Sequence, residues 1–339
     1  MKPDSDEVPL LQVRNLSVRY LARSGPMTVV RDVSFDLRRG EILGIIGESG
    51  AGKSTLGNAI IDLLDPNFEP PTGEIRLNGK AVVDGREREA LRGRKIASVF
   101  QDHTASLDPL MTVGAQLTET ILATDRKVAH SRARALAIEL MGRVGIPDPD
   151  RRYGSYPHQL SGGQRQRVVI AIALAGSPEI IVADEPTSAL DATIQMQILK
   201  LLRRLVDEER LAILLVTHDM GVISEIADRV LVMKNGRVVE ENMTSSALEA
   251  PKNDYTRSLL AAVPRLWISR EGPEPAGQGK SDEEGRSSLS RMSQKLSRLR
   301  GRISSEGDRQ NLRCRMSASA WRAARWRASS AKAEVGKRR

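Results

Sequence analysis

Residues 42–54 read ILGIIGESGAGKS, an apolar run that passes directly into a glycine-rich loop. The loop fits the pattern G-x-x-x-x-G-K-[ST] between a strand and a helix, which is the context of a phosphate-binding P-loop. Glycines let the backbone N–H groups face a β-phosphate, and the helix N-terminus adds positive potential. The alternative is a chance glycine-rich turn that binds no ligand. That alternative does not explain why a strand, the Lys-Ser pair and a helix occur together. The predicted loop comprises Gly47, Glu48, Ser49, Gly50, Ala51, Gly52, Lys53 and Ser54.

Two residues of this loop carry specific expectations. Lys53 is placed to reach the β- and γ-phosphates of a nucleotide, and the Ser54 hydroxyl is placed to ligate Mg²⁺.

A second apolar run, IIVADE at residues 180–185, ends in two acids. The strand would carry Asp184 and Glu185 to the carboxyl edge of the sheet, where ligands bind in open α/β folds. We expect Asp184 to hold Mg²⁺ through water and Glu185 to polarise an attacking water, because phosphoryl transfer depends on positioning and charge stabilisation. A positioned base contributes typically ~10²–10⁴-fold. Taken alone, the two acids fit a solvated strand end equally well.

Hydrophobic periodicity alternates between strands and helices up to about residue 263. The pattern predicts antiparallel strands at 11–20, with a slip near Asn15, and at 33–37. Helical spacing over 113–144 indicates an inserted helical subdomain, about residues 102–164. We therefore expect an α/β fold with a largely parallel sheet, an antiparallel β subdomain and a helical insertion, over residues 1–263. Together with the P-loop string, this arrangement resembles a P-loop NTPase (RecA-like) core. Further strands are predicted at 42–46, 75–78, 179–183, 212–216 and 230–234, and helices at 53–64, 168–174 and 194–206.

The amino-acid composition limits the classes of protein to which the chain can belong. The 339 residues are 40% apolar, enough for a sizeable core, and with only 3% aromatics aliphatic side chains must fill it. No stretch approaches the roughly 18–20 apolar residues of a membrane helix. Residues 1–7 are polar and show no secretory signal, which predicts a protein kept in the cytosol. The one cysteine, Cys314, excludes an internal disulfide and a multi-cysteine metal site.

The charge is unevenly distributed. The net charge is +9, but residues 264–339 hold 19 Lys/Arg against 8 Asp/Glu, so the rest is close to neutral. This tail has too few apolar residues to offset the entropy of ordering, which predicts disorder. Two alternatives remain open: out-of-frame translation, since all three tryptophans and the cysteine lie there, or a basic arm that binds anionic lipid or nucleic acid.

Residues 160–167 read LSGGQRQR and resemble the signature of ABC ATPases. Ser161, Gly162 and Gly163, followed by Gln164, open a helix whose free N–H groups and hydroxyl can meet a γ-phosphate. The resemblance implies ATP and Mg²⁺ as ligands. It also implies that ATP is held between the P-loop of one subunit and the signature of another, so that a dimer is part of the mechanism.

The same resemblance implies roles for single residues. Gln101 matches the glutamine that reaches Mg²⁺ and the attacking water, and His218 matches the histidine that contacts the γ-phosphate. Asp191 matches an aspartate at the dimer interface, and Thr55 extends the P-loop string. Tyr20 matches the aromatic that stacks on adenine, although a tyrosine at a strand end is often simple packing. The resulting catalytic set is Lys53, Gln101, Glu185 and His218.

Narrower strings resemble the oligopeptide, dipeptide and nickel importer branch of the family; they lie at 46–55, 100–109, 156–159, 217–222 and 227–233. The chain departs from that branch at His103, at Asn253-Asp254, and in having one cysteine in its tail. The resemblance implies import of short peptides, with glutathione-like peptides or nickel as alternatives. Implied partners are two integral-membrane permeases, a second identical or paralogous ATPase, and a periplasmic or extracellular solute-binding protein. The implied place is the cytoplasmic face of the cell membrane, as a peripheral subunit.

Two competing functions remain. A non-transport ABC ATPase acting on nucleic acid or ribosomes is supported only by the basic tail, and such proteins usually carry two cassettes, a long coiled coil or zinc modules. A nucleotide-binding subunit without turnover is disfavoured because Lys53, Asp184, Glu185 and His218 are all present.

Overall fold

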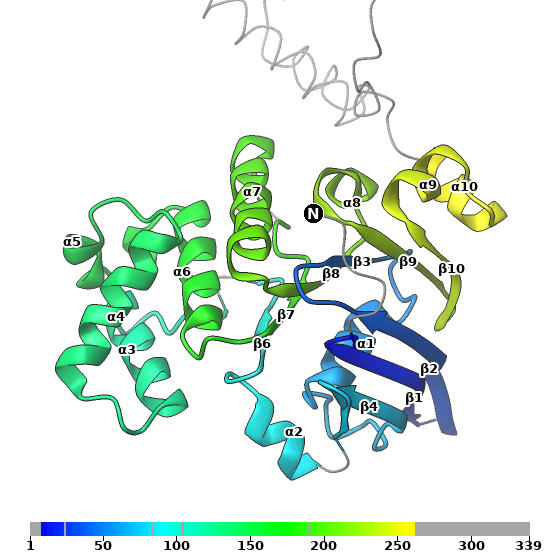
Figure 1. Ribbon diagram of the computed structural model, residues 1–339, viewed down its shortest axis with the longest axis horizontal. Coiled ribbons are helices and arrows are strands. Elements are labelled where there is room, and N and C mark those ends of the chain that lie inside the picture. Colours follow the sequence, from blue (N-terminus) through cyan, green and yellow to red (C-terminus); the bar gives the residue numbers. More distant parts are fainter. Residues whose placement is uncertain (1–7, 24, 83–84, 103–104, 189, 262–339) are drawn as a thin grey trace, which may run out of the picture. The chain divides into compact units, whose positions relative to one another are not determined.

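The computed structural model describes residues 8–23, 25–82, 85–102, 105–188 and 190–261, shown as a ribbon in Figure 1. The strands of its central sheet are β3 Ile42–Ile46, β6 Ile96–Val99, β7 Ile180–Asp184, β8 Ala212–Thr217, β9 Arg229–Lys234 and β10 Arg237–Met243. Their order is β10-β9-β3-β8-β7-β6. All neighbours pair in parallel except β10, which is antiparallel to β9 at the edge. The predicted α/β class with a largely parallel sheet is confirmed.

A second, antiparallel sheet has the order β2-β1-β4-β5. Its strands are β1 Leu11–Ala22, β2 Gly25–Leu37, β4 Thr72–Leu77 and β5 Lys80–Ala81. The predicted slip near Asn15 is a β-bulge: the register with β2 shifts between Val13 and Leu16, and Asn15 has a φ of 51°. A bulge increases the local twist of the strand.

Helices pack beside the central sheet. They are α1 Lys53–Ile60, α2 Gly85–Leu91, α6 Gly162–Leu174, α7 Ala192–Glu209, α8 Met220–Ile226, α9 Thr244–Glu249 and α10 Asp254–Ala261. The predicted helix over 53–64 is wrong in its length. α1 ends at Ile60, because Asp62 adopts a left-handed φ of 56° and such a residue terminates a helix.

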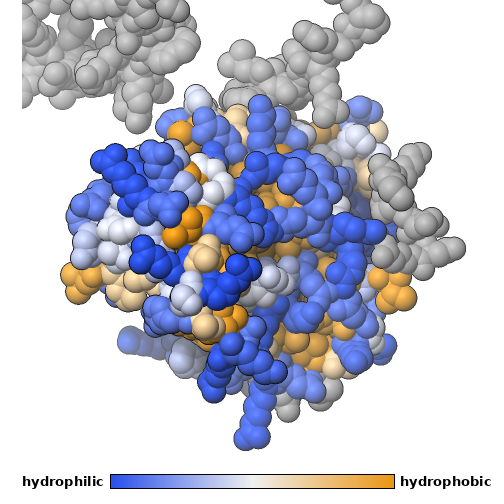
Figure 2. Space-filling view, turned by 60° about the vertical axis from the view of Figure 1, so that its left-hand side comes forward, coloured by the Kyte–Doolittle hydropathy of each residue, from blue (hydrophilic) through white to orange (hydrophobic). Residues whose placement is uncertain are grey.

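The predicted helical run over 113–144 consists of two helices, followed by shorter ones. They are α3 Val113–Thr124, α4 His130–Arg143, α5 Pro149–Tyr153 and the one-turn helix η1 Pro157–Gln159. Thr112 begins α3, since its side chain accepts a hydrogen bond from the Ala115 N–H at 3.3 Å. Both α3 and α4 pack against α6. Figure 2 turns this region toward the viewer and shows a mainly hydrophilic surface with separate apolar patches.

The central sheet separates two hydrophobic cores, because successive side chains of a strand point to opposite faces. In β3, Ile42 and Ile46 belong to one core, and Leu43 and Ile45 to the other. The first core contains the buried side chains of α6, α7 and α8; the second contains those of α1 and the antiparallel sheet. Figure 1 shows α7 and α8 on one face of the sheet and α1 on the other. Strands covered on both faces are continuous apolar runs.

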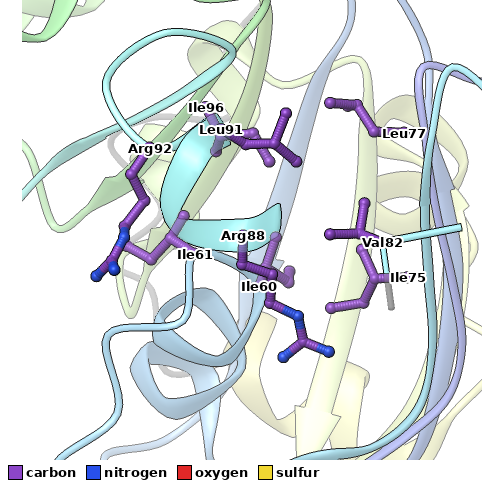
Figure 3. A pocket seen from close by; sticks show the side chains of 9 residues that line it. All are labelled: Ile60, Ile61, Ile75, Leu77, Val82, Arg88, Leu91, Arg92 and Ile96. Atoms are coloured by element: carbon purple, nitrogen blue, oxygen red, sulfur yellow. The ribbon is translucent and has the colours of Figure 1, made fainter. Parts of the chain in front are cut away.

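A small cavity lies within the second core, between the end of α1, β4 and α2 (Figure 3). Apolar side chains line it, with Arg88 and Arg92 at its edge. Its volume of about 10 Å³ has room for about one water molecule, so it is a packing space and not a ligand site.

The basic tail at 264–339 and His103 lie outside the described residues. None of the described helices has the length and apolar composition needed to cross a bilayer.

Glu179, just before β7, links the two sheets. It forms an ion pair with Arg39, which follows β2, and another with Lys95 at 2.5 Å, before β6. It also accepts a hydrogen bond from Asn78, which follows β4, at 3.3 Å. Burial acts to raise the pKa of Glu179, but the hydrogen bonds from Lys95, Arg39 and Asn78 outweigh it and lower the pKa to about 2.

We predict that Glu179→Gln lowers the free energy of unfolding at pH 7 by on the order of 1–2 kcal/mol. A lowered pKa means that the stabilisation is complete above the ordinary value of 4.5 and is lost as the pH falls toward about 2. The deficit of the variant, measured by urea denaturation, therefore shrinks between pH 7 and pH 3. Glu208→Gln, at a carboxylate that is 66% exposed, is the control and changes little at either pH. A deficit that does not depend on pH would contradict the ionised role of Glu179.

Candidate nucleotide-binding site

The P-loop lies between β3 and α1 and curls at its glycines. Gly52 begins α1 in a left-handed conformation with a φ of 95°, and a Cβ added there would lie 2.8 Å from the Val29 carbonyl oxygen. Gly50 has a φ of 83°. Residues 48–50 and Ser54 are exposed, so the backbone of the loop is accessible to a ligand. This is the geometry of an anion cradle at a helix N-terminus.

Lys53 is buried, and its ammonium lies inside the loop. Its Nζ donates to the carbonyl oxygens of Gly47 at 2.8 Å and Glu48 at 2.9 Å. Burial lowers the pKa of Lys53, and the carboxylates of Glu185 and Asp184 oppose that effect. The loop is thus closed around a positive charge, which can pair with phosphate oxygens.

Asp184 ends β7 and has one oxygen without a partner. Burial raises the pKa of its carboxyl, while a hydrogen bond from Ser54 opposes that effect. Its Oδ1 is buried and receives no hydrogen bond. An unpaired carboxylate oxygen beside a hydroxyl fits Mg²⁺, which takes few protein ligands and relies on substrate phosphates. The described residues contain no group of three His, Cys, Asp or Glu side chains that could bind a metal by themselves.

Glu185 follows Asp184 with a left-handed φ of 46° and turns its carboxylate toward two neighbours. His218 Nδ1 lies 2.6 Å from Glu185 Oε1, and Gln101 Nε2 donates to Oε2 at 2.8 Å. Gln101 follows β6 and His218 follows β8, so each comes from a strand beside β7. The structure thus brings together side chains that are 84 and 33 residues from Glu185 in the sequence.

The LSGGQ residues begin α6. The Ser161 hydroxyl accepts from the Gln164 N–H at 3.3 Å, and Gln164 Oε1 accepts from the Ser161 N–H at 3.1 Å, which forms a capping box. Gly163 is buried against α7: an added Cβ would lie 2.5 Å from Ile194 Cγ2. Asp191 caps α7 by accepting from the Ile194 N–H at 2.9 Å. The signature and Asp191 therefore belong to one packed unit.

The signature lies on a different face of the sheet from the P-loop helix. The buried side chains of α6 belong to the first hydrophobic core, and those of α1 belong to the second. The family resemblance implies that one nucleotide contacts the P-loop of one subunit and the signature of another, and within this chain the two segments cover opposite faces of the same sheet.

Tyr20 lies near the end of β1 and is half-exposed. Its ring packs edge-to-face on Phe68, with centroids 5.0 Å apart and an interplanar angle of 63°. The packing holds the ring in place, and the adenine contact stays a prediction. Thr55, in the first turn of α1, is half-buried.

Sequence reasoning missed the residues that hold the P-loop from outside. The Gly236 N–H donates to the Ala51 carbonyl at 3.1 Å, and the Tyr255 hydroxyl accepts from the Glu48 N–H at 3.1 Å. The turn Asn235-Gly236 is visible in the sequence as a hairpin signal. Nothing in the sequence pattern links Tyr255 to a loop 207 residues away.

A buried P-loop lysine after β3, a carboxylate pair at the end of β7, which β8 separates from β3, and a histidine at the same edge define a P-loop ATPase. Comparison with known proteins narrows this class. The sequence profile of the family described as "ABC transporter" matches residues 30–188.

Three similar proteins cover most of the described chain. The oligopeptide transport ATP-binding protein AmiE of Streptococcus pneumoniae is 44% identical over 260 residues, which are 76% of this chain and 73% of that protein. The dipeptide transport ATP-binding protein DppD of Lactococcus lactis is 43% identical over 262 residues, 77% and 75% of the two chains. A dimeric post-hydrolysis structure of the ATP-binding cassette MJ0796, bound to ADP and Pi, has 32% identity and a TM-score of 0.61, covering 69% of this chain and 98% of that one. The chain belongs to the ABC transporter family and is an ATPase.

We predict that Gly52→Ala weakens ATP binding at least about tenfold, because a Cβ would meet the Val29 carbonyl and distort the loop. Gly25→Ala is the matched control, since Gly25 also has a positive φ, 112°, but an added Cβ there meets nothing within 4 Å. Isothermal titration with ATP separates the two effects. Equal affinities in both variants would show that the close approach at Gly52 does not shape the loop.

Proposed function

We propose that this chain is the ATP-hydrolysing subunit of an importer for short peptides, and that it couples ATP binding and hydrolysis to separate membrane permeases. The observation that carries the ATPase mechanism is the Glu185 carboxylate held between Gln101 and His218, beside the buried ammonium of Lys53. Transport is supported by similarity to AmiE and DppD, whose names describe oligopeptide and dipeptide transport.

In this proposal Lys53 and the loop N–H groups bind the β- and γ-phosphates of ATP. Ser54 and Asp184 hold Mg²⁺, which when bound neutralises charge that develops on the phosphate oxygens. Gln101 also contributes to this metal environment, as the family resemblance implies. The unpaired Asp184 Oδ1 supports this arrangement.

Glu185 orients the attacking water and takes its proton. As the water oxygen bonds to the γ-phosphorus, the bond from that phosphorus to the β-phosphate oxygen breaks, which yields ADP and phosphate. A carboxylate accepts about four hydrogen bonds, so each Glu185 oxygen can still accept one while Gln101 and His218 fix its direction. His218 is 64% exposed in the single chain and so is available to a γ-phosphate.

The active form in this proposal is a head-to-tail dimer with an identical or paralogous ATPase. ATP on the P-loop of one subunit is contacted by Ser161, Gly162, Gly163 and Gln164 of the other, with Asp191 at the interface. The placement of α1 and α6 on opposite faces of the sheet supports this, because a second chain can supply the missing half of the site. Ser161 and Asp191 are both exposed in the single chain.

We propose that the permeases dock in a groove beside the helical region, about residues 102–164. The groove has a volume of about 530 Å³ and is lined mainly by apolar side chains, among them Leu63 after α1, Phe100 after β6 and Ile172 on α6. Leu63 is 39% and Phe100 42% exposed, so both present apolar surface to an occupant of the groove. Phe100 directly precedes Gln101, so an occupant of the groove can move a side chain that contacts Glu185.

The remaining parts of the proposal concern the assembly. A solute-binding protein outside the cell would deliver the peptide, and this chain would be a peripheral subunit on the cytoplasmic face of the membrane. Membrane and solute-binding partners select the solute, so glutathione-like peptides and nickel are tested by the same uptake assay. The nucleic-acid alternative rests on residues 264–339, which lie outside the described residues.

We predict that Glu185→Gln keeps ATP binding, lowers turnover at least about 100-fold and accumulates an ATP-bound dimer. Glutamine keeps the shape of the side chain but cannot take the proton from water. Phosphate release gives the turnover, and light scattering with MgATP gives the mass. Glu208→Gln, at an exposed carboxylate of α7, is the control and behaves as wild type. Unchanged turnover in Glu185→Gln would contradict the assigned role.

Peptide import is tested with liposomes that hold two candidate permeases in the membrane and this chain with MgATP inside, while the solute-binding protein and labelled peptide are added outside. We predict that Leu63→Asp weakens permease binding about tenfold and reduces uptake, because a charge in an apolar groove opposes docking. ATP hydrolysis by the isolated chain stays unchanged. Met243→Asp is the control, since Met243 is 53% exposed but lies outside the groove. Equal uptake by the two variants would contradict docking in this groove, and no uptake by wild type would contradict peptide as the solute.

A further inference from the structure

The first observation is a contact between the far end of the described chain and the P-loop. Tyr255, on α10, is only 7% exposed, and its hydroxyl oxygen accepts a hydrogen bond from the Glu48 N–H at 3.1 Å. A tyrosine hydroxyl both donates and accepts, and a buried one usually finds a partner. Here that partner is a backbone group of the loop that surrounds Lys53.

The other side of the loop is held as well. The Ala51 carbonyl accepts from the Gly236 N–H at 3.1 Å, in the turn between β9 and β10. Gly47 lies so close to β9 that an added Cβ would be 2.2 Å from the Met233 carbonyl oxygen. Residues between 233 and 255 therefore hold the P-loop from two sides, although they follow it by almost 200 residues in the sequence.

Residues 252–256, which we call the C-terminal strap, are anchored on one buried carboxylate. Glu240, on β10, accepts from the Lys252 N–H at 3.0 Å, the Asn253 N–H at 3.0 Å and the Thr256 hydroxyl at 2.6 Å. Thr256 is fully buried, and Glu240 is 7% exposed. Burial acts to raise the pKa of Glu240, but the hydrogen bonds from Thr256 and from the strap N–H groups outweigh it and lower the pKa, so the carboxylate is ionised at neutral pH.

The strap also fixes the direction of the Tyr255 ring. The Tyr255 N–H donates to Asn253 Oδ1 at 2.9 Å, which ties the backbone of the tyrosine to the anchored segment. The ammonium of Lys234, at the end of β9, lies 4.5 Å from the ring centroid in a cation–π contact. Glu240 holds the backbone of the strap, and Lys234 contacts the ring. Together they place the Tyr255 hydroxyl beside the Glu48 N–H.

We propose that Tyr255 is a positioning residue for nucleotide binding and that the C-terminal strap keeps the P-loop in its binding conformation. Tyr255 acts through the Glu48 amide and does not touch the nucleotide. A loop that is already ordered loses less conformational entropy when a ligand binds, so the contact raises affinity for ATP. The strap forms no hydrogen bond with Glu185 or His218, so we expect its loss to change nucleotide binding and not the rate of the chemical step.

The test is Tyr255→Phe in the full chain, which removes one hydroxyl and keeps the ring over Lys234. We expect the Kd for MgATP to rise about three- to tenfold, the range of one lost hydrogen bond, with kcat within about twofold of wild type. Hydrogen exchange of the Glu48 amide, followed by NMR, becomes faster because its acceptor is gone.

The chain offers a matched control in Tyr153→Phe. The Tyr153 hydroxyl also has one hydrogen-bond partner, Thr118 Oγ1 at 2.8 Å, but it lies in the helical region away from the P-loop. This variant loses a comparable hydrogen bond, yet its MgATP affinity and Glu48 exchange stay at wild-type values. An equal loss of affinity in both Phe variants would mean a general effect of stability and would overturn the proposal.

Thr256 provides a second test at the anchor. Thr256→Val keeps the volume of the side chain but removes the hydroxyl that donates a hydrogen bond to Glu240. We therefore expect the Kd for MgATP to rise as in Tyr255→Phe. Thr256→Ser restores the hydroxyl and returns the Kd to within about twofold of wild type. Wild-type affinity and wild-type Glu48 exchange in Tyr255→Phe would overturn the inference, whatever solute the assembled protein transports.

Discussion

The buried ammonium of Lys53 is the interaction on which the rest of the site depends. A charge removed from water is costly unless it is paired, and here two carbonyl oxygens of its own loop and two carboxylates across the sheet edge surround it. The carbonyls set the curl of the P-loop, and Asp184 and Glu185 set its distance from β7. Because β3 and β7 both pair in parallel with β8, this distance is fixed by the register of three buried strands.

In our proposal one chain holds two halves of an ATP site, and the same sheet gives the physical reason. Its alternating side chains create two separate cores, and α1 packs into one while α6 packs into the other. The P-loop and the signature are thus each rigidly supported, yet on different faces. Gln101 links the nucleotide site to the groove that we assign to the permeases. It follows β6, contacts Glu185 and lies directly after Phe100, which lines that groove. A change at that groove can therefore reach, through Gln101, the Glu185 carboxylate that we propose is catalytic.

Local patterns predicted the core elements well and the periphery poorly. The apolar runs of β3, β7, β8 and β9 and the bulge at Asn15 are visible in the sequence because burial on both faces and a broken alternation leave clear signals. The helix beginning at Lys53 is shorter than its apolar pattern indicates, since a left-handed Asp62 ends it. β10 and the helices α8 to α10 were not predicted, because edge strands and short helices have mixed polarity. The contact of Tyr255 with Glu48 depends on tertiary packing alone, which no local pattern encodes.

The central claim is that two chains complete each ATP site from opposite faces. The most direct measurement is a crystal structure of the chain with Mg²⁺ and a non-hydrolysable ATP analogue. The account predicts two copies related head to tail, with the γ-phosphate bound by Lys53 of one copy and within hydrogen-bond distance of Ser161 of the other. A nucleotide bound at Lys53 in a single chain, with the residues at 160–167 facing solvent, would contradict it.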